Sequence, residues 1–320
     1  MFKHVKPSKL LAGDTVAIIT PSEPMPAEIL LNVKDYFTKK GMNIVTGPNI
    51  GKAIGDYVAG TPAQRADDFN WAFSNPDIKA IIVGFGGMGA NQILDEIDFD
   101  LVKKNPKIFC GYSDATTLQL AAFAKSNLIT FHSPNAAAFP DLKQSGYTLK
   151  HFWRIVSNEI SGDVIEPQST WQVIVPGQME GIIFGGNLSC IGKLMGTKWD
   201  PVKYSLENFS SKEKIIFFWE EVEEQYSEII RSLWQIRNSG LFEIVSGMIV
   251  GKLTSVAETD YVQFPSKKAL ILEAVKSFGF PVVYGFDFGH EVPKATIPIG
   301  IRGKIDTSKL VLELLEPSVI

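Results

Sequence analysis

Strand-like and helix-like segments alternate through the first half of this chain, and this alternation limits the fold more than any other feature. Short apolar runs are separated by segments whose apolar residues recur every three or four positions. A strand, a helix and a second strand in succession form a right-handed crossover, so the pattern predicts an α/β fold with a parallel sheet. The expected elements are strands Thr15–Thr20, Asn43–Thr46, Ala80–Phe85 and Leu128–Phe131 and helices Pro26–Lys40 and Pro62–Ser74.

The pattern changes near the middle of the chain. Glycine and proline interrupt residues 161–177, which we expect to connect an α/β domain of residues 1–160 to a smaller domain of residues 178–320. The second part holds more strand-like runs, including Lys214–Trp219 and Val282–Phe286, with helical segments between them. We therefore expect a mixed sheet there, in an α/β or barrel-like arrangement.

One predicted strand ends close to a serine. The apolar run that begins at Ile108 ends at Gly111, Ser113 follows, and an apolar segment of helical period begins at once. Such a strand-to-helix turn is typical of a nucleophile elbow, which directs backbone N–H groups at the target of the exposed side chain. Asp114 and Ala115 stand where the usual G-x-S-x-G pattern has x-Gly. The alternative is an ordinary strand in which Ser113 or Asp114 caps the next helix.

A glycine-rich loop, residues 84–89, follows another predicted buried strand. Its spacing does not fit the G-x-G-x-x-G fingerprint, and it follows about the third strand rather than the first, which argues against a nucleotide cofactor. Bare backbone can instead offer N–H groups to an oxyanion, and the amides of Gly87 and Asp114 are the candidate donors. The alternative is a tight turn that needs positive φ.

A serine nucleophile needs a general base, and the chain has 4 histidines. His4 lies in a terminal tail and His151 lies near the expected domain connection, which leaves His132 and His290. His290 is flanked by glycine and proline after a predicted strand, where a loop positions functional side chains. A solvated loop histidine is the alternative interpretation.

A third, orienting group would complete the set. The apolar strand Lys214–Trp219 ends on Glu220 and Glu221, and a carboxylate at that position can accept the Nδ1–H of a histidine. The residues alone do not distinguish the two acids. Acidic residues favoured at a helix N-terminus are the simpler explanation of Glu221, Glu223 and Glu224.

Composition excludes several classes of protein. The net charge is −4 and no block of lysine and arginine occurs, so nucleic acid is not an expected partner. No segment reaches the roughly 18 uninterrupted apolar residues that a membrane helix needs, and no signal peptide is evident, so we expect a cytoplasmic protein with no membrane partner. The two cysteines, Cys110 and Cys190, lie in apolar surroundings and are expected to be buried thiols rather than a disulfide or a metal pair.

Several of these motifs occur together, in one order, in a known family. The chain resembles, along nearly its whole length, the serine peptidase family of L,D-carboxypeptidases and microcin C immunity peptidases. The matching segments are Leu10–Ser22, Gly86–Asn91, Pro106–Thr117 with its G-Y-S-D, Thr130–Pro134, Gly185–Ser189, Gly196–Thr197, Gly289–Pro293 and Thr296–Gly300.

The resemblance implies a Ser-Glu-His triad made of Ser113 as nucleophile, His290 as general base and then acid, and Glu220 as the orienting carboxylate. It implies oxyanion amides from Gly87 and Asp114. The implied architecture is a flavodoxin-like N-terminal domain and a smaller C-terminal domain with the site between them, and no cofactor or metal is expected.

Two substrates remain open under this resemblance. The L,D-carboxypeptidase branch releases D-alanine from murein tetrapeptides in cell-wall recycling, whereas the immunity branch cleaves an amide between a peptide or amino acid and a nucleotide analogue. Trp199 is a candidate aromatic wall for the nucleotide, and Arg231 could pair with a substrate carboxylate or form a solvent-facing ion pair. A homodimer is expected, although the sequence does not itself reveal oligomeric state. The rival of another class is a non-catalytic protein that binds a small ligand.

The chain departs from the family pattern in two places beside the implied pocket. His132-Ser133-Pro134 stands where H-G-P is usual, and Glu220-Glu221-Val222-Glu223-Glu224 stands where E-D-x-x-E is common. Neither departure changes an implied triad residue, so it is the substrate assignment that they affect.

Overall fold

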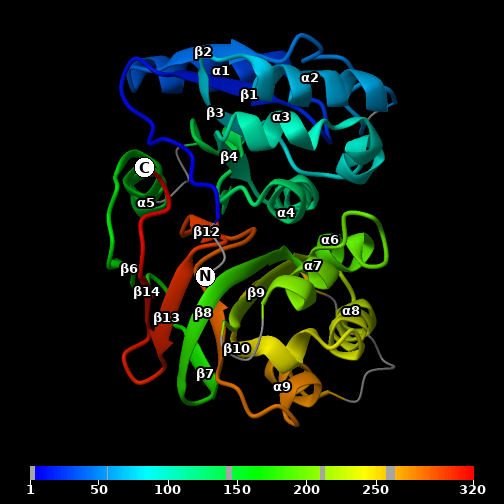
Figure 1. The fold of residues 1–320 in the computed structure, drawn as a ribbon, viewed down its shortest axis with the longest axis vertical. Helices are drawn as coiled ribbons and strands as arrows, with labels where there is room; N and C mark the ends of the chain where they lie inside the picture. Colours follow the sequence, from blue (N-terminus) through cyan, green and yellow to red (C-terminus); the bar gives the residue numbers. More distant parts are fainter. Residues whose placement is uncertain (1–3, 56, 142–145, 210–212, 257–263) are drawn as a thin grey trace.

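The computed structural model describes residues 4–55, 57–141, 146–209, 213–256 and 264–320. The chain forms two sheets, one of six strands and one of eight. Figure 1 shows the two sheets one above the other, with the N-terminal half of the chain in the upper layer. The α/β class predicted from the alternating segments is confirmed.

The first sheet has the order β12-β5-β4-β3-β1-β2. Its five strands from the N-terminal half are parallel, and their order is the flavodoxin-like one, as expected. The elements of this half are β1 Thr15–Ile19, α1 Ala27–Lys39, β2 Asn43–Thr46, α2 Pro62–Ser74, β3 Ile78–Val83, η1 Ala90–Glu96, α3 Phe99–Lys104, β4 Ile108–Gly111, α4 Ala115–Ser126, β5 Thr130–His132, η2 Ala136–Ala138 and α5 Gly146–Ser157.

The second sheet has the order β6-β14-β13-β8-β9-β10-β11-β7. Strands β8 to β11 are parallel and the outer strands are antiparallel, so the sheet is mixed and open rather than a barrel. The remaining elements are β6 Asp163–Ile165, β7 Gln172–Val175, β8 Gln178–Asn187, α6 Leu188–Leu194, α7 Pro201–Asn208, β9 Ile215–Val222, α8 Tyr226–Asn238, η3 Leu241–Ile244, β10 Val245–Thr254, α9 Lys267–Val275, β11 Val282–Phe286, β12 Ile297–Ile299, β13 Arg302–Asp306 and β14 Val311–Leu314.

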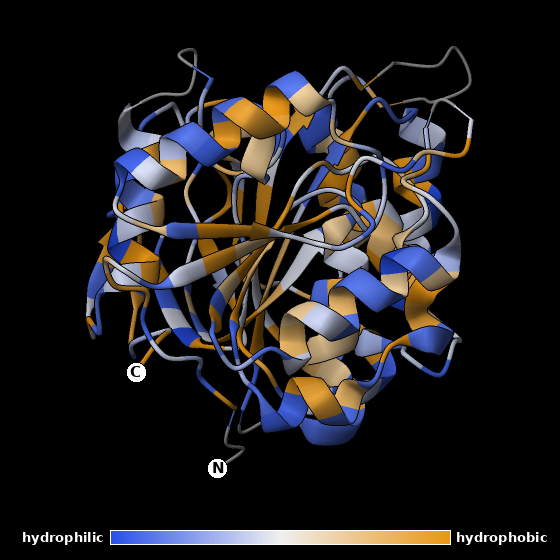
Figure 2. Cartoon of the chain, turned by 90° about the horizontal axis from the view of Figure 1, so that it is seen from above, coloured by the Kyte–Doolittle hydropathy of each residue, from blue (hydrophilic) through white to orange (hydrophobic). Residues whose placement is uncertain are grey.

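Local sequence explains where the elements of the first sheet begin and which strands are buried. Helix α2 begins with a capping box, in which the Thr61 side chain accepts from the Gln64 amide and the Gln64 side chain accepts from the Thr61 amide, with Pro62 behind the cap. Strand β3 is buried at every position except Lys79, as its continuous apolar run predicts. Figure 2 shows apolar strands at the centre and, around them, helices that carry both hydrophilic and hydrophobic residues.

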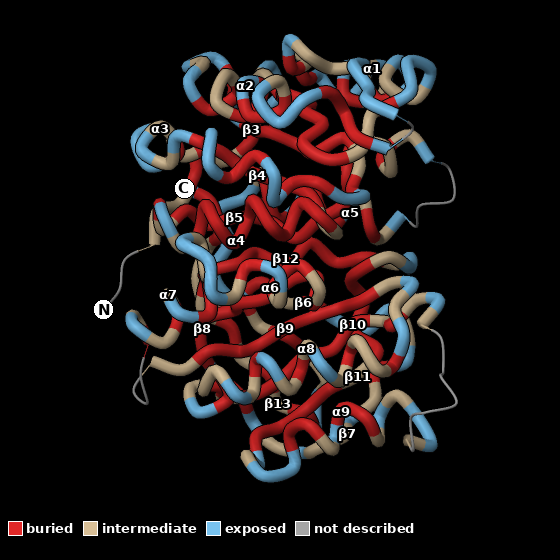
Figure 3. The backbone as a smooth tube through the Cα atoms, turned by 90° about the vertical axis from the view of Figure 1, so that its right-hand side faces the viewer, coloured by how far each residue is buried: buried red, intermediate tan, exposed pale blue. Residues whose placement is uncertain are grey.

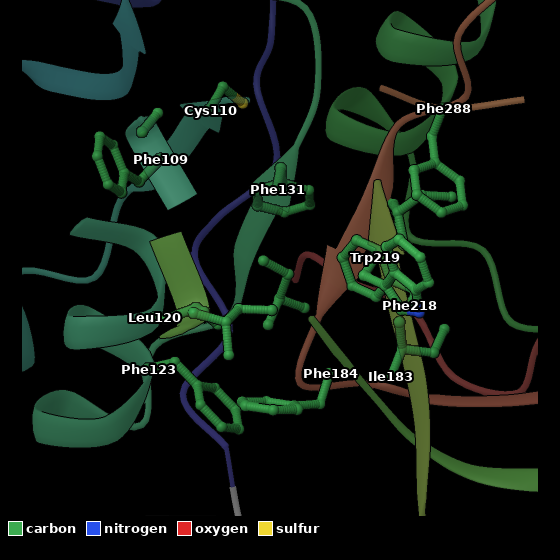
Figure 4. Close-up of a cluster of buried hydrophobic side chains, with 14 of the residues drawn as sticks. Phe109, Cys110, Leu120, Phe123, Phe131, Ile183, Phe184, Phe218, Trp219 and Phe288 are labelled. Atoms are coloured by element: carbon green, nitrogen blue, oxygen red, sulfur yellow. The ribbon is translucent and has the colours of Figure 1, made fainter. Parts of the chain in front are cut away.

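One hydrophobic core spans both sheets. Strand β12, from the C-terminal part of the chain, pairs antiparallel with β5 and extends the first sheet toward the second. The rings of Phe123 and Phe184, one from each part, have centroids 6.0 Å apart, and Figure 4 shows the cluster to which they belong. Buried backbone runs through both layers in Figure 3. The two halves are therefore packed against each other through apolar contacts.

Two further expectations can be compared with the structure. Cys110 and Cys190 are free and buried, which confirms the prediction of buried thiols. No helix among the described residues combines the length and the apolar character needed to span a bilayer.

Candidate active site

Ser113 lies in the sharp turn between β4 and α4, at the carboxyl end of the first sheet. Its backbone has φ +63°, a conformation that a non-glycine residue adopts at an energetic cost and that nucleophile elbows share. A Cβ atom on Gly86 would lie 2.9 Å from Ser113 Oγ, so only a glycine allows the neighbouring loop to approach the hydroxyl this closely. The strand-turn-helix geometry predicted for this stretch is present.

The side chain of Asp114 does not cap α4. Its Oδ2 accepts hydrogen bonds from Ser22 Oγ at 2.7 Å and from the Ala90 amide at 2.8 Å. Burial raises the pKa of this carboxyl, while these two donors oppose the rise. Asp114 thus stands at the N-cap position of α4, as the alternative predicted, but its side chain bonds no amide of that helix and instead ties the elbow to the loops after β1 and β3.

The amides of Gly87 and Asp114 were the predicted oxyanion donors. Gly87 has φ +97° and lies in the wall of the same cavity as Ser113. Within the described part of the chain, neither N–H has a hydrogen-bond acceptor. Positive φ at Gly87 and at Gly89, where it is +109°, also confirms the tight turn that glycine makes possible. Both interpretations of the glycine-rich loop are thus compatible.

Glu220 and His290 meet at the carboxyl ends of β9 and β11. His290 Nδ1 lies 2.7 Å from Glu220 Oε2, and the carboxylate is completely buried. Burial alone would raise the pKa of Glu220, but the hydrogen bond and charge of His290 outweigh it and the pKa is lowered. Gly289 allows this approach, because a Cβ there would lie 2.9 Å from Glu220 Oε2. The pair can hold an imidazole in one tautomer and stabilise its protonated form.

Glu221 points away from His290. Its carboxylate accepts from Asn187 Nδ2 at 2.9 Å and from both the amide and the hydroxyl of Ser189, at 2.8 and 2.7 Å. Asn187 Nδ2 also lies 3.3 Å from Glu220 Oε1, so the two acids share Asn187, but only Glu220 contacts His290 and only Glu221 contacts Ser189. The structure thus separates Glu220 and Glu221, which the sequence alone could not do.

A cavity of about 520 Å³ brings Ser113 and His290 into one wall. It lies between the two halves of the chain, because residues of the loops after β1, β3, β4 and β5 line it together with the last residue of β9 and residues that follow β9 and β11. Among the described residues no group of three His, Cys, Asp or Glu side chains is arranged to hold a metal ion. The lining residues are Glu23, Phe85, Gly86, Gly87, Met88, Tyr112, Ser113, Asn135, Ala137, Ala138, Asp141, Val222, Glu223 and His290.

The structure adds functional neighbours that sequence reasoning missed. The Tyr112 ring meets His290 edge to face at 4.8 Å, and the Lys294 ammonium lies 4.2 Å above the same ring. Asn135 Oδ1 accepts from the Tyr112 amide at 3.0 Å and so fixes the start of the elbow. Tyr112 was adjacent to the predicted serine, and Asn135 follows a predicted strand end. Lys294 gave no comparable signal.

Three other candidate residues do not line this cavity. Trp199 borders a different hollow, with Lys125 and Tyr204, so the structure does not bring it near Ser113. Arg231 is 75% exposed and pairs with Glu228, which is the solvent-facing ion pair named as the alternative. His132 is buried in β5, 1% exposed, among aromatic rings.

The chain is similar to known proteins along most of its length. The probable murein peptide carboxypeptidase of Bacillus subtilis is 29% identical over 306 residues, which cover 96% of this chain and 93% of that protein. The microcin C7 self-immunity protein MccF of Escherichia coli is 29% identical over 326 residues, covering 93% of this chain and 92% of that protein.

Two solved structures extend the likeness to three dimensions. MccF in complex with glutamyl sulfamoyl guanosine superposes with a TM-score of 0.86 at 26% identity, covering 98% of this chain and 99% of that one. Muramoyltetrapeptide carboxypeptidase from Oxalobacter formigenes gives 0.79 at 25% identity, covering 94% and 97%.

Both halves of the chain match domain models of one family. Residues 16–133 match the LD-carboxypeptidase N-terminal domain, and residues 180–305 match the LD-carboxypeptidase C-terminal domain. Since the two matches follow each other in the family's order and together span most of the chain, the protein belongs to the LD-carboxypeptidase family of serine-type carboxypeptidases.

Proposed function

We propose that this protein hydrolyses a peptide amide bond with a triad of Ser113, His290 and Glu220. The observation that carries the proposal is the buried Glu220 carboxylate, 2.7 Å from His290 Nδ1, beside a cavity that both His290 and Ser113 line. Nucleophile, base and orienting acid come from different elements of the chain. A triad is defined by the geometry and roles of its residues, and not by their order in the sequence.

In the proposed reaction His290 Nε2 takes the proton of Ser113 while Oγ attacks the scissile carbonyl carbon. The carbonyl oxygen becomes an oxyanion, which the amides of Gly87 and Asp114 stabilise. Glu220 stabilises the imidazolium, which then gives its proton to the leaving amine as the C–N bond breaks. A water molecule, deprotonated by the same histidine, hydrolyses the acyl-enzyme and restores Ser113.

The proposed substrate is a murein tetrapeptide from which terminal D-alanine is released in the cytoplasm. Three carboxylate residues line the cavity, Glu23, Asp141 and Glu223, and no lysine or arginine lies among its described lining residues. Such a wall favours a substrate that carries an ammonium group, and the diamino acid of a murein peptide supplies one.

A second candidate is cleavage of an amide between an amino acid or peptide and a nucleotide analogue. The higher TM-score with MccF, 0.86 against 0.79, favours it. Trp199 does not line the cavity, so an aromatic wall for a base would have to come from Phe85 or Tyr112.

Parallel incubation with murein tetrapeptide and with processed microcin C, followed by mass spectrometry, tests the two candidates. We expect loss of one D-alanine from the tetrapeptide, absent in Ser113→Ala. Cleavage of the microcin alone would transfer the assignment to the second candidate. A fluorophosphonate probe tests the catalytic class separately: we expect covalent labelling that Ser113→Ala abolishes, and well-folded protein that stays unlabelled would favour the non-catalytic binder.

A further inference from the structure

Arg65 is a buried arginine that joins two loops of the candidate site. It projects from α2, is 1% exposed, and its Nη1 donates to the Pro21 carbonyl at 2.7 Å and to the Gly89 carbonyl at 2.8 Å. Pro21 belongs to the loop after β1, and Gly89 belongs to the glycine-rich loop after β3. Nη2 donates to Gln92 Oε1 at 2.6 Å. Arg65 therefore connects helix α2 to the loop that contains Gly87.

Asp114 joins the same two loops from the other side. Its carboxylate accepts from Ser22, next to Pro21, and from the amide of Ala90, next to Gly89. Burial lowers the pKa of Arg65 and raises the pKa of Asp114, and the attraction between their charges opposes both shifts. Two buried, opposite charges thus each bind both loops, and one of them is on the residue that follows Ser113.

The glycine-rich loop is shaped to receive this arginine. A Cβ on Gly89 would lie 3.0 Å from Arg65 Nη1, and Gly89 has φ +109°. Gly87 is two residues away, and its own amide faces no acceptor within the described chain. Charge-assisted hydrogen bonds to buried carbonyls are strong and directional, so they can set where that amide points.

We propose that Arg65 is a positioning residue which, with the Asp114 carboxylate, fixes the glycine-rich loop and so places the Gly87 amide of the oxyanion hole. Arg65 itself is not among the residues that line the cavity of Ser113. The inference rests on the proposed function, because the position of Gly87 affects the rate only if its N–H stabilises an oxyanion.

Replacing Arg65 by methionine keeps the apolar stem and removes every donor. Displacement of an oxyanion donor costs far more in the transition state than in substrate binding, so we expect kcat to fall about 10- to 100-fold with KM changed less than about threefold. The rate at which a fluorophosphonate labels Ser113 is expected to fall by a similar factor, because the same hole receives the phosphoryl oxygen. Arg65→Lys, which retains the charge, is expected to give an intermediate rate.

Lys107 provides a matched control. It is 5% exposed and its Nζ donates to the carbonyls of Ala72 and Asn75, but it lies at the amino end of β4, away from Ser113. Lys107→Met also removes a buried cation that binds two backbone carbonyls. We expect it to lower the melting temperature while kcat and the labelling rate of the folded protein stay within about twofold of wild type.

Each outcome bears on the proposal. Folded Arg65→Met with the kcat and labelling rate of Lys107→Met would overturn it, and if Arg65→Met does not fold, wild-type kcat in Arg65→Lys would overturn it. If wild type labels at Ser113 but releases no D-alanine, the proposed substrate fails, while slower labelling of Arg65→Met still supports the positioning role. Folded wild type that does not label would overturn both.

Discussion

Glu220→Gln tests the proposed triad with the smallest change of shape. In the wild type, Glu220 Oε2 faces His290 Nδ1 and Oε1 lies 3.3 Å from Asn187 Nδ2. A glutamine side chain has only one oxygen, so it can accept from His290 Nδ1–H or from Asn187 Nδ2–H but not from both. When the oxygen faces Asn187, the amide nitrogen faces Nδ1, and His290 must then carry its proton on Nε2. In that tautomer Nε2 has no free lone pair, so it cannot accept the proton of the Ser113 hydroxyl.

The expected loss is large because the charge also disappears. A wrong tautomer and an unsupported imidazolium in a serine triad lower kcat by about 10⁴-fold, and each factor of ten corresponds to about 1.36 kcal/mol of activation free energy. We therefore expect kcat to fall by about 10³- to 10⁴-fold, or about 4 to 5.5 kcal/mol. Because the wild-type pKa of Glu220 is lowered, its carboxylate is ionised at neutral pH, where kcat of the two proteins is to be compared.

Glu221→Gln is the matched control, one residue away on the same strand. Its carboxylate holds Asn187 and Ser189, so we expect the free energy of unfolding to fall by about 1 to 3 kcal/mol. The folded variant should keep kcat within about threefold. D-alanine release at saturating tetrapeptide, together with urea unfolding, measures both quantities. A Glu220→Gln kcat within tenfold of wild type, or equal losses in the two variants, would refute the assigned role of Glu220.

Three further predictions concern stability and are checked by urea unfolding. Ser113→Gly should unfold with a free energy about 1 kcal/mol higher than Ser113→Ala, because only glycine adopts φ +63° without strain; equal values would contradict strain at the elbow. Burial lowers the pKa of Lys294 from 10.5 to about 8, so between these values the unfolded chain binds more protons and stability rises with pH. Lys294→Met should remove that rise, and an unchanged slope from pH 8 to 10 would count against it. Asp287→Asn should cost about 3 kcal/mol, because this fully buried carboxylate binds Trp171 Nε1 at 2.8 Å and pairs with Lys252; a cost below 1 kcal/mol would be unexpected.

Local patterns allowed much of the fold to be predicted. Helix Pro62–Ser74 and strands Asn43–Thr46 and Val282–Phe286 have the predicted bounds, since capping residues and apolar runs mark their ends. The turn at Ser113 was predicted because a strand, a glycine and a helix are contiguous there. Strand β12 was not predicted, since three residues that include a proline give no periodic signal. They form a strand only because they pair with β5, which is far away in sequence.

The features of the site that the sequence did not reveal depend on long-range geometry. Trp199 is close to the family-like segment in sequence, but the chain turns into α7 and carries the ring to another surface. Arg65 and Lys294 were not predicted as members of the site, because each reaches it through contacts with residues far away in sequence. A charged residue inside an otherwise amphipathic segment is expected to be exposed, and only the folded chain reveals that Arg65 is buried.

The distance between Ser113 and His290 is set by how the loop of His290 is held at both ends. On one side the loop continues from β11, which belongs to the second sheet; on the other it leads into β12, which pairs with β5 of the first. Strand β5 is the neighbour of β4, and Ser113 follows β4 directly. Ile297 lies opposite His132, and Gly111 lies opposite the same residue on the other side of β5. Two ladders therefore connect the loop of the histidine to the elbow of the serine, so the packing of the two sheets, and not a flexible linker, determines whether proton transfer between them is possible.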